Sequence, residues 1–158
     1  MSKNTAIHEA GHAVIAIVLG LSVRGATIIP DGNSAGHIIY GTAPEDTWEK
    51  WLERGKYRTL ASVVRARIIS TMAGAEAERE LIGYCDGGDG DDVYQVTCMA
   101  DSELMPTLSD EWAPLELRMR RQTRRLVKRH RENIKLIANA LAERRTLSAV
   151  DIAVELKL

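Results

Sequence analysis

The feature that most constrains this chain is a short motif close to its start. Residues 8–12 read His-Glu-Ala-Gly-His and lead into an apolar run that stops at Gly20. The pattern predicts one helix over residues 5–19, with Gly20 as its stop signal. Because residues four apart on a helix share a face, His8 and His12 present their imidazoles side by side. The chain is therefore expected to bury a helix that carries a polar, chemically active site.

The two histidines have the spacing of a zinc-binding pair. Imidazole nitrogens at positions i and i+4 of one helix can bind the same tetrahedral zinc ion. Glu9 follows the first histidine and is placed to accept a proton from water whose pKa zinc lowers to roughly 7. We therefore expect one zinc ion per chain, with His8 and His12 as ligands and Glu9 as general base in the hydrolysis of a peptide bond.

The third protein ligand has to come from elsewhere in the chain, because two histidines and a water leave a tetrahedral zinc ion one ligand short. A metzincin requires a histidine six residues after the second one, and Val18 occupies that position, so this class is excluded. A downstream glutamate, Glu76 or Glu78, would make the protein a gluzincin. An aspartate from the acidic loop at residues 85–92 is the other alternative. Spacing alone leaves both open.

Length and composition favour one soluble domain over residues 1–158. A formal net charge of −1 produces no general field that attracts nucleic acid or an anionic membrane. The most apolar run is about half as long as a membrane-spanning helix, and it lacks the flanks of a secretory signal. The two cysteines are too few for a disulfide framework. We therefore expect a cytoplasmic protein.

The remaining pattern predicts a mostly helical α+β fold with a small sheet of two or three strands. Short β-branched or apolar runs predict strands at residues 23–29 and 36–40, joined by a turn. Helical spacing is found over residues 45–53, 57–82, 115–144 and from 91 or 92 toward 104. A short last helix is expected after residues 146–148, which cap it, and it should end near residue 156. Residues 105–114 are expected to form a loop, which divides a catalytic core of about 1–104 from C-terminal helices over about 115–158.

These segments resemble the peptidase domain of the FtsH-type membrane-bound AAA proteases. Residues 8–13 match the family's active-site helix, and residues 26–30, followed by Gly36, look like its strand pair. Residues 73–83 are similar to the family's helix reading GGRAAEELVFG. The zinc-binding aspartate of the family follows the last glycine of that helix by nine residues, which is Asp92 in this chain.

The resemblance implies a zincin-like fold in which His8, His12 and Asp92 hold the zinc ion. It also implies that an extended substrate lies along the second strand, so Gly36, His37 and Ile38 are expected to bind substrate through the main chain.

The resemblance does not extend to an ATPase module, since the chain has no GxxxxGK[ST] phosphate loop. We therefore expect no nucleotide, and an ATP-independent peptidase that acts on peptides or unfolded segments.

A catalytically silent metal-binding scaffold is the alternative, with partners recruited by residues 118–131, which hold eight arginines and lysines. The apolar positions of that segment keep their helical spacing, which favours a solvated helix face over a nucleic-acid site, and homo-oligomers remain open.

Overall fold

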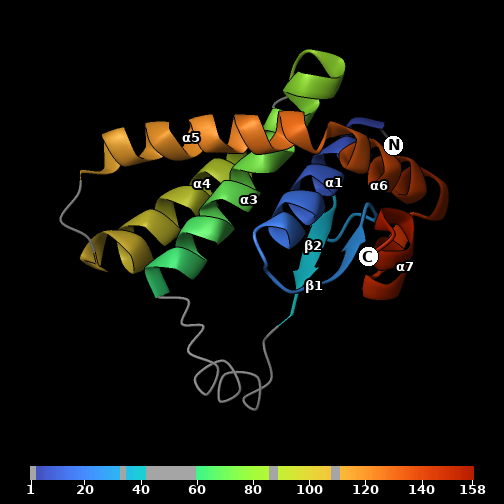
Figure 1. Ribbon diagram of the computed structural model, residues 1–158, viewed down its shortest axis with the longest axis horizontal. Coiled ribbons are helices and arrows are strands. Elements are labelled where there is room, and N and C mark those ends of the chain that lie inside the picture. The colour runs from blue at the N-terminus through green and yellow to red at the C-terminus, as the bar shows by residue number, and fades with distance from the viewer. Residues whose placement is uncertain (1–2, 33–34, 42–59, 86–88, 108–110) are drawn as a thin grey trace.

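The structure is a computed structural model that describes residues 3–32, 35–41, 60–85, 89–107 and 111–158 (Figure 1). Its α-helices are α1 (Lys3–Val18), α3 (Leu60–Ile82), α4 (Gly90–Met99), α5 (Trp112–Arg129), α6 (Arg131–Arg144) and α7 (Ala149–Leu156). Its strands are β1 (Val23–Thr27), β2 (His37–Tyr40) and β3 (Thr146–Ser148). The expected fold class, α+β and mostly helical with a small sheet, is confirmed.

Helix α1 lies at the centre of the molecule, between α3, α6 and the sheet (Figure 1). All residues from 6 to 16 are buried, including both histidines of the motif and Glu9. A helix that is apolar on nearly every side is stable only when neighbours cover all of its faces. The helix expected over residues 5–19 is thus confirmed, and it is placed where solvent has little access to its polar side chains.

Helices α1 and α3 approach each other closely because small residues meet at their contact. A Cβ atom added to Gly11 would lie 2.6 Å from the carbonyl oxygen of Ala73 and 2.7 Å from the Cβ of Ala77. No real Cβ atom tolerates such contacts, so position 11 requires glycine at this helix separation. The contact brings the backbone of α3 directly beneath the motif of α1.

The sheet is antiparallel, with the strand order β2-β1-β3. Ala26 of β1 pairs with Ile38 of β2 on one side and with Leu147 of β3 on the other. The third strand therefore comes from the C-terminal part of the chain, where residues 146–148 were expected only to cap a helix. They do both, because Ser148 forms a capping box with Asp151 at the start of α7.

The helical pattern over residues 115–144 divides into two helices, which corrects the expectation of a single one. Helix α5 ends at Arg129, and His130 leaves the helical conformation with φ −103° and ψ 17°. The break turns α6 so that Ile134, Ile137 and Leu141 pack into the core. Helix α5 also begins at Trp112, inside the expected loop, because proline is compatible with a first helical turn and Pro114 lies there.

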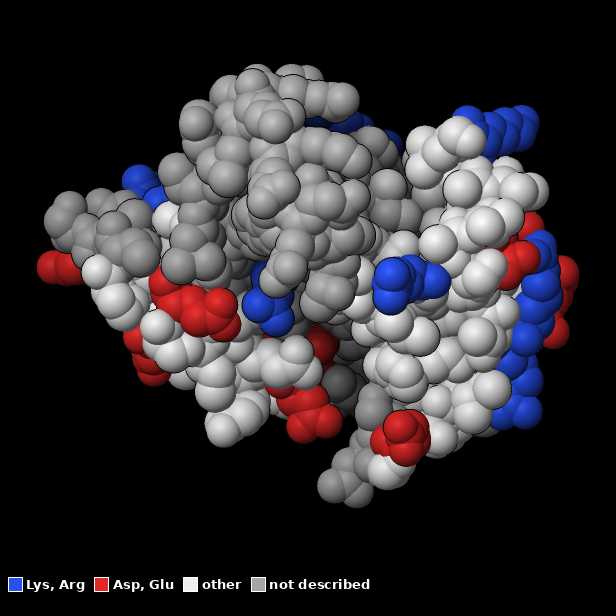
Figure 2. Space-filling model, turned by 90° about the horizontal axis from the view of Figure 1, so that it is seen from below, with Lys and Arg blue, Asp and Glu red and all other residues white. Residues whose placement is uncertain are grey.

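The other expectations have mixed outcomes. The helix expected at residues 45–53 and the start of the one expected at 57 lie outside the described residues. None of the helices that the structure describes has the length and apolar character needed to cross a membrane. Cys85 and Cys98 are free thiols. Basic and acidic side chains both occur on the described part of the face turned away from α5 (Figure 2).

The Gly11 contact generates a stability prediction. Gly11→Ala should lower the free energy of unfolding by about 1–3 kcal/mol, because the added methyl group overpacks α1 against the α3 backbone. The matched control is Gly90→Ala, since an added Cβ at that position meets nothing within 4 Å. Thermal or urea unfolding should show a stable control and a destabilised Gly11 variant, and equal stability of both would contradict the proposed helix contact.

Candidate metal and peptidase site

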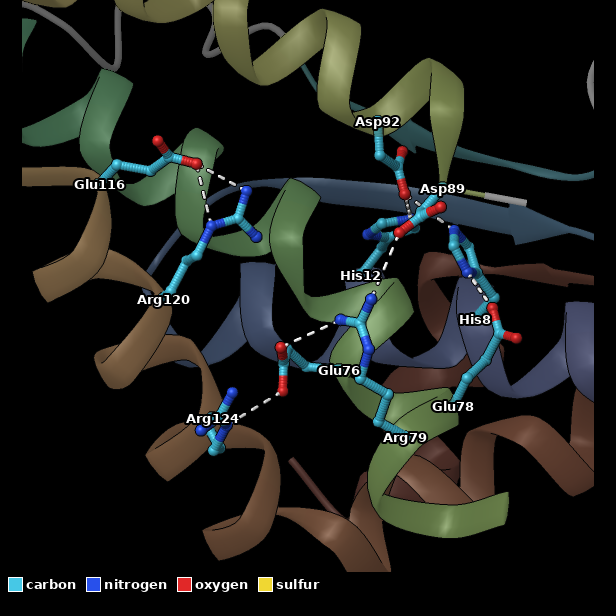
Figure 3. A network of polar contacts seen from close by, with 10 residues as sticks. All are labelled: His8, His12, Glu76, Glu78, Arg79, Asp89, Asp92, Glu116, Arg120 and Arg124. Atoms are coloured by element: carbon cyan, nitrogen blue, oxygen red, sulfur yellow. Dashed lines mark hydrogen bonds and ion pairs between the residues drawn. The ribbon is translucent and has the colours of Figure 1, made fainter. Parts of the chain in front are cut away.

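Three side chains from two helices converge on one point. His8 and His12 come from α1, and Asp92 comes from the first turn of α4 (Figure 3). The Oδ2 atom of Asp92 lies 2.9 Å from Nε2 of His8 and 3.3 Å from Nε2 of His12. One ligand atom from each residue falls within 4.8 Å of the others. Ligands of a tetrahedral zinc ion lie about 3.3 Å from one another, so this group has the dimensions of a zinc site.

The hydrogen bonds behind the histidines select the tautomer that binds metal. Nδ1 of His12 donates to the carbonyl oxygen of Ser70 at 2.8 Å. Nδ1 of His8 lies 2.5 Å from a carboxylate oxygen of Glu78, which is itself buried. A carbonyl and a carboxylate only accept, so each Nδ1 carries the proton and each Nε2 faces Asp92. This arrangement is the usual support for histidines that ligate a metal, and the donor set fits zinc.

Gly74 makes the space that the two imidazoles occupy. A Cβ atom at this position of α3 would lie 2.5 Å from Nε2 of His12 and 2.6 Å from Nε2 of His8. These are the atoms that face Asp92, so any side chain at position 74 would fill the candidate metal site. Neither Gly74 nor Ser70 was singled out from the sequence as a site residue. The run of small residues at 73–75 could have indicated that Gly74 lies at a close contact. A main-chain acceptor such as the Ser70 carbonyl leaves no such pattern in the sequence.

The structure places the two candidate glutamates away from the ligand position. Glu78 occupies Nδ1 of His8, on the opposite side of the ring from Asp92. Glu76 pairs with Arg79 at 3.1 Å and with Arg124 at 3.4 Å instead (Figure 3). The gluzincin alternative, with Glu76 or Glu78 as third ligand, is therefore opposed by the geometry, and the contacts favour Asp92.

His8 and Asp92 stabilise each other's charged form in the metal-free chain. Burial lowers the pKa of His8, but the hydrogen bond and the charge of Asp92, together with the bond to Glu78, outweigh this effect and raise it to about 9. Burial raises the pKa of Asp92, yet hydrogen bonds to His12 and His8 hold it well below its usual range. Asp92 is thus a carboxylate at neutral pH, as a metal ligand has to be.

Glu9 is buried beside the candidate ligands and is only 5% exposed. Burial raises the pKa of its carboxyl group, against the charges of His12 and His8, which lower it. A general base works best when its pKa is shifted toward the operating pH, and burial shifts Glu9 in that direction. A Cβ atom on Gly36 would lie 2.9 Å from Oε1 of Glu9, so the start of the second strand packs directly on the candidate base.

The residues expected to bind substrate lie at the outer strand of the sheet. Strand β2 is an edge strand, and Gly36 directly precedes it. His37 is the first residue of β2 and is half-buried. Ile38 is partly buried and packs against the hydrophobic core.

Comparison with known proteins agrees with these features. The model of peptidase family M41 matches residues 1–117. The ATP-dependent zinc metalloprotease FtsH of Acholeplasma laidlawii is 29% identical over 116 residues, which cover 72% of this chain and 16% of that protein. FtsH of Hahella chejuensis is 31% identical over 116 residues, covering 72% of this chain and 17% of its own.

A relative from a plant matches nearly the whole chain. This relative is the ATP-dependent zinc metalloprotease FTSH 11, chloroplastic/mitochondrial, of Arabidopsis thaliana. It is 27% identical over an alignment of 176 positions, gaps included, which covers 95% of this chain and 21% of that protein. The chain therefore spans about a fifth or less of these relatives. The family model spans well over half of the chain, and its span includes the histidine motif and Asp92: the chain belongs to peptidase family M41.

Proposed function

We propose that this chain is a zinc-dependent endopeptidase that holds one zinc ion through His8, His12 and Asp92. The observation that carries the proposal is the convergence of these three side chains within 4.8 Å, next to the buried carboxyl group of Glu9. The hydrogen bonds from Nδ1 of both histidines support it, because they turn Nε2 of each ring toward Asp92.

The chain's own residues supply binding, orientation and proton transfer. Zinc, when bound, acts as a Lewis acid that polarises the scissile carbonyl and lowers the pKa of water. Glu9 accepts a proton from the attacking water and passes it to the leaving amine, because it is the buried carboxyl group beside the histidines. Glu78 and the Ser70 carbonyl keep the two imidazoles in the tautomer that leaves Nε2 to the metal.

The substrate is proposed to be a peptide or an unfolded segment that aligns along β2. An edge strand recruits an extended chain through main-chain hydrogen bonds, and only a segment without stable tertiary structure can adopt that form. Gly36, which packs on Glu9, would then lie beside the substrate backbone. The relatives are named ATP-dependent, whereas residues 1–158 contain no phosphate-binding loop, so we propose that this domain cleaves such substrates without ATP. A cytoplasmic location stays a prediction.

Four proteins purified without added metal test the proposal: wild type, Glu9→Gln, Asp92→Ala and Glu78→Ala. Elemental analysis should find one zinc ion per chain in the wild type and none in Asp92→Ala. Glu78→Ala should bind zinc about 10–100-fold more weakly, because it loses an orienting bond and not a ligand. Hydrolysis of a dye-labelled unfolded polypeptide without nucleotide should fall about 100–10,000-fold in Glu9→Gln while zinc is retained.

Each contrary result of this experiment has a different meaning. Zinc lost with Glu78 but kept without Asp92 would establish a gluzincin. Unchanged hydrolysis in Glu9→Gln would exclude Glu9 as the base, and a zinc-loaded wild type without any hydrolysis would support the scaffold alternative. A wild type without zinc would overturn the proposal.

Gly74→Ala tests where the metal binds. The added methyl group would displace two buried imidazoles, and the higher helix propensity of alanine offsets this cost only in part, so the metal-free variant should fold but unfold at an equal or lower temperature. The added methyl group would lie 2.5 Å from Nε2 of His12, so zinc affinity should fall about 10–100-fold or more. Equal zinc affinity in wild type and Gly74→Ala would place the metal somewhere else.

Metal removal should also change how stability depends on pH. In the folded metal-free chain the pKa of His8 is raised from 6.5 to about 9, so its stabilising contribution is complete below about pH 6.5 and is lost as pH rises through about 9. The loss is on the order of 3 kcal/mol by linkage. Urea unfolding of chelator-treated protein at pH 6.5 and 9.5 measures it. A His8→Gln variant with the same pH dependence would contradict the assignment.

A further inference from the structure

The first turns of α4 have no apolar anchor, although they carry Asp92. Val93 and Tyr94 are 48% and 71% exposed. The buried residues of the helix, Val96 and Met99, lie further along it. Hydrophobic packing therefore fixes the far end of α4 and leaves the position of Asp92 to polar contacts near the helix start.

The residue at the start of α4 uses its carboxylate for a contact to another helix. Asp89 is the N-cap residue, but its side chain makes no capping hydrogen bond. An aspartate at this position ordinarily accepts from the backbone N–H groups of the first turn. The Oδ2 atom of Asp89 instead lies 3.4 Å from Nη2 of Arg79, which belongs to α3. Helix α4 thus begins at Gly90, one or two residues before the expected start, and Asp89 ties this beginning to α3.

Arg79 is held in turn by a buried carboxylate. Glu76 lies one helical turn earlier on α3, and its Oε1 atom is 3.1 Å from Nη1 of Arg79. The side chain of Glu76 is only 9% exposed, so its charge requires partners. Arg124 of α5 contacts the other carboxylate oxygen at 3.4 Å. Figure 3 shows the resulting chain of contacts, with Arg79 between Glu76 and Asp89, beside the histidines.

We propose that Arg79, oriented by Glu76, is a positioning residue that fixes the first turn of α4 through Asp89 and so holds Asp92 at the metal site. Asp89 is the N-cap residue of α4 and Asp92 lies in the first turn that follows it. An ion pair at position 89 restrains the rotation and the approach of the turn that bears Asp92. The inference rests on the proposed function, because it assigns Asp92 to the metal.

Two variants distinguish an electrostatic effect on metal affinity from a positioning effect, because the two effects predict opposite changes for one of them. Arg79→Ala removes a positive charge near a cation site, so electrostatics alone would strengthen metal binding. Asp89→Asn removes a negative charge and would weaken it. If Arg79 positions Asp92, both variants release the start of α4 and both weaken binding. The direction of the change in Arg79→Ala therefore decides between the two effects.

The test measures zinc and cobalt affinity of the full chain by competition with a chromophoric chelator. Arg79→Ala and Asp89→Asn should each raise the Kd about 10-fold, at the lower end of the range for residues that support metal ligands. The Kd of the double variant should be no higher than that of the single variant that binds metal less tightly, because both changes break the same contact. Arg79→Lys, which keeps the charge, should restore part of the affinity. Unfolding curves recorded without metal confirm that each variant folds.

Arg120→Ala is the matched control. Arg120 and Glu116 form an ion pair within α5, and their side chains are 40% and 29% exposed, compared with 43% and 29% for Arg79 and Asp89. Arg120→Ala should leave the Kd for metal unchanged. Affinity in Arg79→Ala that equals or exceeds the wild type, or strictly additive losses in the double variant, would overturn the inference and leave the zinc site standing. A wild type that binds neither metal would overturn the proposed function as well.

Discussion

The close contact between α1 and α3 is the constraint on which the other features of the site depend. Gly11 meets the backbone of Ala73, and Gly74 leaves room for the imidazoles one residue further along α3. A larger side chain at either position would separate the helices or fill the site. Because α3 lies so close, it also supplies the Ser70 carbonyl and the Glu78 carboxylate to the Nδ1 atoms of the histidines. One steric condition thus sets both the space for a metal and the orientation of its ligands.

Burying so many charged groups in a small region is tolerable only because each has a partner. An isolated carboxylate in an apolar interior is strongly destabilised, whereas one that is paired and hydrogen-bonded is not. Glu78 lies against His8, Asp92 lies against both histidines, and Glu76 lies against Arg79 and Arg124. Glu9 has the weakest compensation, since burial raises its pKa in spite of the two imidazoles. The group with the least compensation is the one proposed to exchange protons.

The sequence predicts the parts of this site that depend on local periodicity. His8, Glu9 and His12 follow from a five-residue pattern on a helix, and the buried α1 follows from its apolar run. Asp92 was identified through the spacing of a related family, and local periodicity left it open against Glu76 and Glu78. The helix break at His130 was not predicted, because no glycine or proline marks it. The strand at residues 146–148 was not predicted either, because it forms only when β1 lies beside it. The Ser70 carbonyl that accepts from His12 belongs to the backbone, so its role cannot be predicted from the residue type.

The two kinds of ligand differ in how firmly the fold holds them. His8 and His12 belong to a helix that is buried on every side, so their positions are fixed by the core and by two hydrogen bonds. Asp92 belongs to a turn whose apolar neighbours are exposed, and its position depends on polar contacts. A site built in this way keeps two ligands rigid and leaves the third sensitive to the surface. Differences in metal affinity among chains with the same histidine motif are therefore expected to arise at the start of α4, because the packing of α1 against α3 permits little variation.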